Sequence, residues 1–288
     1  MRPDFVAMAN EGIVGVIHEA TFPRLERDAR YYERQRAALE AGLLWGAYHY
    51  GDATNPIGQA DHFMNAVASA PPPIRPNDPE KRRGVLLVLD FEKNGHYPGG
   101  TMSVAQAVAF VERIKERTGK YPGLYCSEYR LRQMHYGPRA TSAYRQTLAN
   151  CWLWIANYHA EPRNTAPWRT WHMWQYCGDG KCNLRPRSLF PKSVANIRKA
   201  ERNIFRGDNA ALQAFWRETR GILRDNDGRF PVTIELRTVV PTSALALYFG
   251  LSPKSPHSQA LLQIHRGYFY KCRFALVSHL HRIARSRH

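Results

Sequence analysis

Two carboxylates, Asp90 and Glu92, end an apolar run and are the residues of this chain best suited to chemistry. The run from Val85 to Leu89 is typical of a buried strand in a parallel sheet. Side chains alternate along a strand, so residues 90 and 92 point the same way, about 6–7 Å apart at roughly 3.3 Å per residue. Like charges this close raise the pKa of one group while the other stays ionised. Glycoside cleavage needs a protonated acid beside a fixed carboxylate.

Taken alone, the tripeptide from Asp90 to Glu92 fits a polar loop after a strand better than a catalytic pair. The surrounding elements change this balance, because strand-like and helix-like segments alternate along the first 180 residues. The strand-like segments are residues 12–18, 43–50, 85–89, 121–127, 151–158 and 171–176. The helix-like segments are residues 28–41, 55–70 and 103–117, the last with Ser103 as its expected N-cap. This alternation predicts parallel βα units, and their number predicts an α/β fold with an irregular TIM-like barrel.

In such barrels the working residues lie at the C-terminal ends of the strands. Those ends here carry aromatic and amide side chains beside the two carboxylates: Tyr48, Tyr125, Trp154, Tyr158, Trp174 and Gln175. Their repeated placement favours a groove in which sugar rings stack. The alternative is that Trp154, Tyr158 and Trp174 all belong to the barrel core.

Length and composition limit the class of protein to which this chain can belong. A chain of 288 residues with 44% hydrophobic residues can bury one large core, or a core and an appendage. No stretch of about 18 apolar residues occurs, so no transmembrane segment is expected, and the N-terminus lacks the apolar region of a signal peptide. The formal charge of +17 is concentrated in the last third. It suggests a nucleic-acid-binding surface only weakly, because no nucleic-acid-binding motif accompanies it.

The five cysteines do not indicate a disulfide framework, since their number is odd and no signal peptide is visible. Cys177 and Cys182 are spaced to pair across a turn. Cys272, with His279 and His281, does not match a zinc-ligand spacing. We therefore expect no metal and no cofactor.

Seven segments, in order, resemble the glycoside hydrolase family 25 muramidases (Chalaropsis-type lysozymes) over about residues 4–216. These are residues 15–21, 41–50, 89–92, 121–125, 152–158, 174–176 and 201–208. The resemblance implies an irregular α/β barrel that cleaves the β-1,4 bond between N-acetylmuramic acid and N-acetylglucosamine in peptidoglycan. It implies that Glu92 is the general acid and that Asp90 assists the acetamido group of the substrate.

The same resemblance assigns further residues to the sugar groove and marks departures from the family. Tyr125, Trp154, Tyr158 and Gln175 match groove positions, and Glu201 stands where the family has a closing Asp. The family's first strand, which ends in a site Asp, is absent, so we expect a barrel that is N-terminally truncated by one strand. Asp4 matches a later loop position and does not replace that Asp. Glu19 stands where the family has a Lys.

We therefore expect a muramidase-like barrel over residues 1–219 and a loosely ordered basic extension over residues 220–288. The expected partner is peptidoglycan, with no nucleotide cofactor, and the expected state is a monomer. Action on the cell wall requires secretion or release by lysis; otherwise the chain is cytoplasmic. Two alternatives stay open: a catalytically impaired barrel that binds glycan, and a basic nucleic-acid-binding protein.

Overall fold

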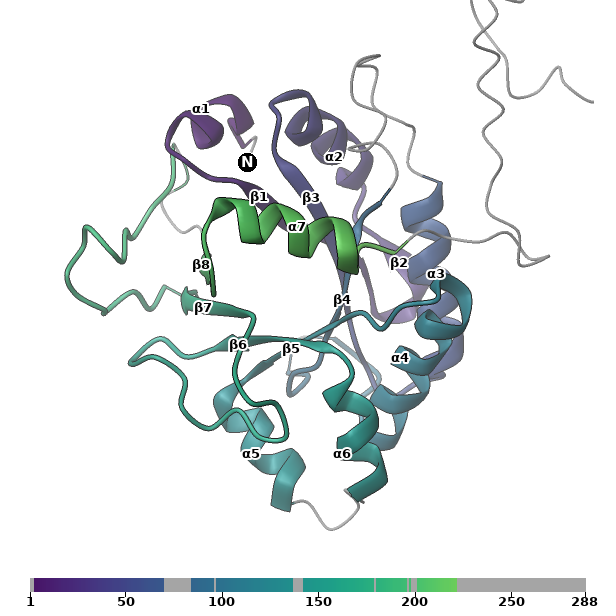
Figure 1. Ribbon diagram of the computed structural model, residues 1–288. Helices are drawn as coiled ribbons and strands as arrows, with labels where there is room; N and C mark the ends of the chain where they lie inside the picture. Colours follow the sequence, from purple (N-terminus) through teal and green to yellow (C-terminus); the bar gives the residue numbers. More distant parts are fainter. Residues whose placement is uncertain are drawn as a thin grey trace, which may run out of the picture. The chain divides into compact units, whose positions relative to one another are not determined.

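The computed structural model describes residues 3–69, 84–95, 97–136, 142–178, 180–195, 197 and 201–221 (Figure 1). From residue 222 onward, the predicted extension lies outside these ranges, and so does Cys272. The loose order of the extension and the lack of a zinc site at Cys272 therefore stay predictions. In the described ranges, no helix combines the length and apolar character that crossing a bilayer requires.

One curled sheet positions the candidate site (Figure 1). Its described strands are β1 (Gly15–Phe22), β2 (Glu26–Arg27), β3 (Leu44–Tyr50), β4 (Leu86–Asp90), β5 (Gly123–Ser127), β6 (Trp152–Ala156), β7 (Met173–Cys177) and β8 (Arg202–Phe205). The order across the sheet is β2-β1-β3-β4-β5-β6-β7-β8. The pairs from β1–β3 to β6–β7 are parallel, and β2 and β8 pair antiparallel at the two edges. The predicted α/β barrel-like fold is confirmed, in the form of an open, curled sheet.

Helices connect the parallel strands and cover the outer face of the sheet (Figure 1). The described helices are α1 (Phe5–Asn10), the 3-10 turn η1 (Pro23–Leu25), α2 (Tyr31–Glu40), α3 (Pro56–Ala68), α4 (Val104–Thr118), α5 (Glu128–Tyr136), α6 (Ser142–Ala149) and α7 (Asn209–Thr219). Ser103 caps α4 as predicted, and it forms a capping box with Gln106. Gly119 ends the same helix at a φ of 78°, a left-handed conformation that glycine adopts without strain.

The strands bury both faces, and the two faces have different partners. Side chains on the outer face, such as Leu89 and Phe91, join one apolar cluster with Phe63 of α3 and Phe110 of α4. Side chains on the inner face, Leu86, Val88, Trp152 and Met173, form a second cluster with Trp216 of α7. The inner face is therefore filled with apolar side chains at the end of the sheet that α7 covers.

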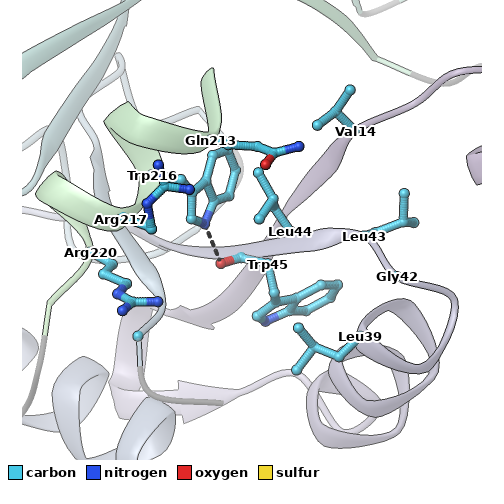
Figure 2. Close-up of a pocket in the computed structure, with 11 residues that line it drawn as sticks. Val14, Leu39, Gly42, Leu43, Leu44, Trp45, Gln213, Trp216, Arg217 and Arg220 are labelled. Carbon is cyan, nitrogen blue, oxygen red and sulfur yellow. Dashed lines mark hydrogen bonds between the residues drawn. The ribbon is translucent and has the colours of Figure 1, made fainter. Parts of the chain in front are cut away.

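Helix α7 lies across the N-terminal ends of the central strands (Figure 1). Its Trp216 is buried, and the indole Nε1 donates a hydrogen bond of 3.1 Å to the backbone oxygen of Trp45 (Figure 2). A cavity of about 240 Å³ adjoins this contact, lined by both tryptophans with Val14, Leu44 and Arg217 among others. No carboxylate lines this cavity, so the acid chemistry expected from the sequence must lie elsewhere.

Cys177 and Cys182 form a disulfide with a Cα–Cα distance of 4.6 Å, the pairing that their spacing left open. Gly178 and Lys181 close the enclosed turn through two backbone hydrogen bonds. The disulfide therefore ties the end of β7 to the loop that follows it.

Candidate active site

A small polar pocket lies at the C-terminal ends of the parallel strands, opposite α7. Its volume is about 50 Å³. Its lining residues are Tyr48, Asp90, Glu92, Tyr125, Trp154, Tyr158, Gln175 and Glu201. All eight are among the nine residues that the sequence assigned to the site. Elements far apart in the sequence thus bring the two carboxylates together with the aromatic and amide groups.

The register of the strands explains this convergence. Asp90 of β4 stands beside Tyr125 of β5, which stands beside Trp154 of β6. Since neighbouring residues in register point to the same face, these three side chains all face the inside of the curled sheet. Farther along the sheet, Gln175 of β7 faces the same way, opposite Asn203 of β8. The inner face therefore changes from apolar to polar where the strands end.

Trp174 does not line this pocket. It precedes Gln175 on β7, so its side chain lies on the other face, in the apolar cluster of the outer face. Its indole Nε1 donates to the backbone oxygen of Asn157 over 2.8 Å, and its ring packs against Trp171 and Phe190. Trp174 therefore lies in the core, the alternative considered from the sequence, whereas Trp154 and Tyr158 lie at the pocket.

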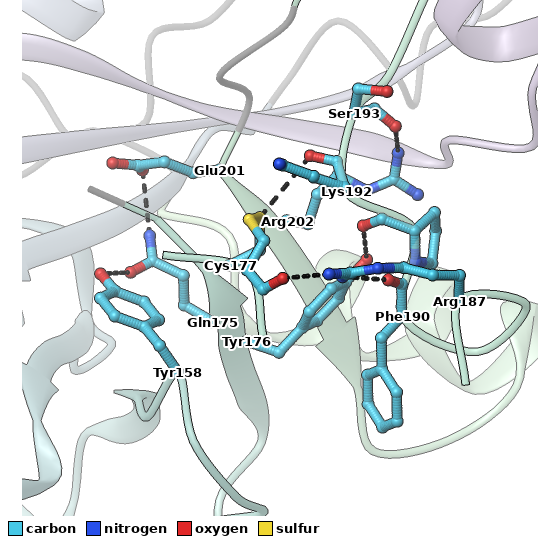
Figure 3. Close-up of a disulfide and its surroundings, with 12 residues drawn as sticks. Tyr158, Gln175, Tyr176, Cys177, Arg187, Phe190, Lys192, Ser193, Glu201 and Arg202 are labelled. Atoms are coloured by element: carbon cyan, nitrogen blue, oxygen red, sulfur yellow. Dashed lines mark hydrogen bonds between the residues drawn. A yellow bond between two sulfur atoms is a disulfide. The ribbon is translucent and has the colours of Figure 1, made fainter. Parts of the chain in front are cut away.

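Gln175 organises one wall of the pocket (Figure 3). Its Oε1 accepts hydrogen bonds from the hydroxyl groups of Tyr125 at 2.6 Å and Tyr158 at 2.7 Å. Its Nε2 donates to Oε2 of Glu201 over 3.0 Å. Because Oε1 accepts both phenol protons, the amide can have only one orientation, with the NH2 group toward Glu201.

Tyr48 and Tyr125 line the pocket as neutral phenol groups. Burial raises the pKa of Tyr125 well above its usual value, and the neighbouring Glu92 raises it further. Burial likewise raises the pKa of Tyr48, with Glu19, Asp90 and others adding to the effect. A neutral phenol can bind a sugar hydroxyl group or acetamido oxygen without adding charge to a site that is already acidic.

Two contacts hold the backbone between the carboxylates. The side chain of Phe91 points away from the pocket and is fully buried, and its backbone N–H donates to the oxygen of Tyr125 over 2.8 Å. The guanidinium of Arg130 lies 4.3 Å above the Phe91 ring, at the distance of a cation–π contact. Asp90 and Glu92 therefore flank Phe91, whose position is fixed by its packing in the core.

Two supporting residues escaped the sequence analysis. Asn203 accepts a 2.8 Å hydrogen bond from Nε1 of Trp154, whose ring lies 4.6 Å from that of Tyr125. The alternation of side chains from Glu201 onward was a signal for Asn203, because residues 201 and 203 share a face.

The second of these residues is Glu128, which is only 8% exposed. Its carboxylate accepts hydrogen bonds from the side-chain amides of Asn157 at 2.6 Å and Asn164 at 2.9 Å. It thereby braces the loop that carries Tyr158. No local pattern distinguishes this acid from a surface residue at the start of a helix, so only the fold could identify it.

The pocket combines two carboxylates on one strand end, a third from Glu201, neutral phenols, an amide and an indole. Such a set can transfer a proton, stabilise a developing positive charge and stack on a sugar ring. Within the described ranges, no group of three or more His, Cys, Asp or Glu side chains is arranged to hold a metal ion.

Comparisons with known proteins identify the family of this chain. The family model described as Glycosyl hydrolases family 25 matches residues 2–183. Among curated proteins, the autolytic lysozyme of Clostridium acetobutylicum is 35% identical over 65 residues, which are 23% of this chain. The matched segment spans only 20% of the length of that relative.

Solved structures share the fold. The bacterial lysozyme from Streptomyces coelicolor superposes with a TM-score of 0.55 at 24% identity, over 75% of this chain and 92% of the other. The muramidase from Trichobolus zukalii superposes with a TM-score of 0.52 at 20% identity, over 76% of this chain and 94% of the other. At these identities the superpositions establish the common fold, and the family assignment rests on the sequence match.

Proposed function

This chain belongs to the glycosyl hydrolases of family 25, and on that premise we propose that it is a muramidase. The proposed reaction is hydrolysis of the β-1,4 bond between N-acetylmuramic acid and N-acetylglucosamine in peptidoglycan. The observation that carries the proposal is the shared cleft of Asp90 and Glu92 with Tyr125, Trp154 and Gln175. Acting on the cell wall, the chain would be secreted or released by lysis.

In this proposal Glu92 is the general acid. Its carboxyl proton passes to the glycosidic oxygen as the bond to the anomeric carbon breaks. The acetamido oxygen of the same sugar attacks that carbon and forms a cyclic oxazolinium ion, whose positive charge Asp90 stabilises. Water then adds to the anomeric carbon, with Glu92 now accepting a proton, and the ring opens to restore the acetamido group.

The remaining lining residues bind the glycan. In this proposal the ring of Trp154, which Asn203 holds in place at the pocket wall, contacts the apolar face of a sugar. The hydroxyl groups of Tyr125 and Tyr158, and the amide of Gln175, are positioned by one another and recognise polar groups on the sugar.

Purified peptidoglycan tests the proposal. We expect the chain to release fragments whose new reducing ends are muramic acid, which borohydride reduction followed by hydrolysis and sugar analysis identifies. Reducing ends that are glucosamine would assign the chain to a different bond. Glu92→Gln should lower the rate by about 10²–10⁴-fold, the usual contribution of a positioned acid. Glu33→Gln, the same change at an exposed position on α2, should keep the parent rate.

One observation favours a second candidate, a barrel that binds glycan without cleaving it. In the described part of the chain, the outer edge of β1 pairs with another strand only at Thr21 and Phe22. A barrel with an open edge next to its pocket has fewer groups with which to position substrate. Tight binding of peptidoglycan fragments by the parent chain, with no new reducing ends, would establish this candidate instead.

A further inference from the structure

Glu19 is a fourth acidic residue beside the pocket, on strand β1. In the parallel pairing of β1 and β3 it stands in register with Tyr48, which lines the pocket. Ile17, two residues earlier, packs in the inner apolar cluster with Tyr48. Because alternate residues share a face, the side chain of Glu19 also points to the inside of the curled sheet.

Tyr97, in the loop between β4 and α4, forms a side-chain hydrogen bond with Glu19. Its ring stacks on Phe22 with centroids 5.6 Å apart and meets Tyr50 edge-on at 5.0 Å. Tyr50 in turn stands in register with the lining residue Asp90. We call Phe22, Tyr97 and Tyr50 the aromatic strip; it runs from Glu19 toward the carboxylates of the pocket.

We propose that Glu19 is a specificity-determining residue, whose carboxyl group forms a hydrogen bond with the bound glycan on the β1 side of the pocket. The aromatic strip receives the apolar face of the same sugar. This inference rests on the proposed function for the class of ligand, a peptidoglycan glycan. It adds a second contact region to the one that Trp154 and Gln175 supply.

The surroundings of Glu19 determine which form of its carboxyl group is present. The pKa of Glu19 is raised to about 7: burial is the largest cause, the like charges of Asp28 and Glu201 add to it, and the Tyr97 hydrogen bond opposes them. The titratable and charged groups that face it are Asp28 after β2, Tyr48 and Tyr50 on β3, Tyr97, and Glu201 before β8.

The hydrogen-bonding capacity of Glu19 therefore changes near neutral pH. Below pH 7 the protonated carboxyl group donates a hydrogen bond to the sugar. Above pH 7 the carboxylate can only accept, and it adds negative charge near Glu201. Binding of the glycan should weaken across this transition.

Isothermal titration calorimetry with a peptidoglycan-derived tetrasaccharide, from pH 5.5 to 8.5, tests the proposal. The host is full-length Glu92→Gln, so that the ligand is not consumed and Glu92 does not titrate. We expect Kd to rise about threefold to tenfold between the two pH limits, the worth of one hydrogen bond. In Glu19→Gln, whose amide donates at every pH, Kd should stay near its low-pH value.

Two further variants separate the proposal from a general structural effect. Tyr97→Phe keeps the aromatic strip but removes the hydrogen bond that favours the charged carboxylate. It should therefore move the binding transition to higher pH. Glu33→Gln is the matched exposed control and should behave as the host. Thermal melting confirms that each variant folds.

The outcomes for Glu19 and for the proposed function are distinct. A pH dependence of Kd that survives in Glu19→Gln, or a transition that Tyr97→Phe does not move, overturns the inference alone. If the host shows the expected pH dependence of Kd but the parent chain, with Glu92 intact, does not cleave peptidoglycan, the muramidase proposal is overturned. The inference about Glu19 then still stands. Absence of tetrasaccharide binding at every pH overturns both.

Discussion

Nε2 of Gln175 lies 3.0 Å from Oε2 of Glu201, a hydrogen bond that joins β7 to the segment preceding β8. Through its oxygen, the same amide accepts from the hydroxyl groups of Tyr125 and Tyr158. One side chain therefore orients three polar groups of the pocket, and it is itself only 1% exposed. Three other lining residues therefore depend on a single amide for their geometry.

Gln175→Met preserves the length of this side chain but removes its hydrogen-bonding groups. The buried phenol of Tyr125 then loses its acceptor, which should cost about 1–3 kcal/mol of the free energy of unfolding. Urea denaturation measures this cost. Gln133→Met, at an exposed position on α5, is the control and should change stability by less than about 0.5 kcal/mol. Equal effects of the two changes would show that the amide does not organise the pocket.

Asp90→Asn preserves shape but loses the charge expected to stabilise the cationic intermediate. We expect kcat to fall by about 10²–10³-fold, the usual loss for one preorganised electrostatic group, with little change in Tm. Turnover of purified peptidoglycan and a thermal melt measure the two quantities. Asp61→Asn, on α3 and outside the pocket lining, should keep the parent kcat. A large fall in Tm with normal turnover would make Asp90 a structural residue.

Trp216→Ala should destabilise the chain by about 3–5 kcal/mol, because it removes a buried indole and enlarges the adjoining cavity. The close fit is visible at Gly15, where an added Cβ would lie 3.2 Å from Cη2 of Trp216 and 3.0 Å from Cβ of Leu44. Denaturant unfolding measures the loss, and Leu189→Ala, at an exposed leucine, is the control. A small effect would show that α7 is not needed to close the N-terminal end of the sheet.

Stability should fall when the pH decreases from 7 to 5.5, because a buried histidine must stay neutral. Burial lowers the pKa of His49 from 6.5 to about 4. The folded state thus binds the proton less readily than the unfolded state. The contribution of His49 to the free energy of unfolding is complete above pH 6.5 and is lost progressively as the pH falls toward 4. Over the stated interval the expected loss is about 1 kcal/mol.

The histidine prediction needs a background in which Glu19 does not titrate. The pKa of Glu19 is raised from 4.5 to about 7, so ionisation of Glu19 destabilises the fold as the pH rises through this interval. This effect on stability is opposite in sign to that of His49 and falls in the same pH range. Urea denaturation of Glu19→Gln at several pH values isolates the histidine effect. His18, whose pKa burial also lowers to about 4, adds a smaller part because it is partly exposed. Stability that is constant from pH 7 to 5.5 would contradict the prediction.

Elements whose signals are local could be predicted from the sequence alone. Ser103 and the apolar stripe after it predicted α4, and the apolar run before Asp90 predicted β4. Asn55 caps α3 within the segment that was predicted to be helical. Caps and periodicity depend on neighbours along the chain, so they can be read without the fold. The placement of the carboxylates at a strand end followed for the same reason.

The short elements could not be predicted in this way. α1 has six residues, α6 has eight, and α5 is short and charged, so each offers only a short hydrophobic pattern. α7 is stabilised by the burial of Trp216 against strands that lie far away in the sequence. Such elements gain most of their stability from packing, which no local window contains.

The face that each strand turns toward the pocket could not be predicted from the sequence, because it depends on how the strands pair. The central strands are buried on both faces, so their sequences show no apolar–polar alternation that distinguishes inside from outside. Trp174 and Gln175 were equally plausible groove residues on this ground, and the register of β6, β7 and β8 sends Gln175 inward and Trp174 into the core. The juxtaposition of Glu19 with Tyr97 arises likewise from the pairing of β1 with β3 and from a loop that returns across them. The types of these residues can be read from the sequence, but their proximity depends on contacts between segments that only folding brings together.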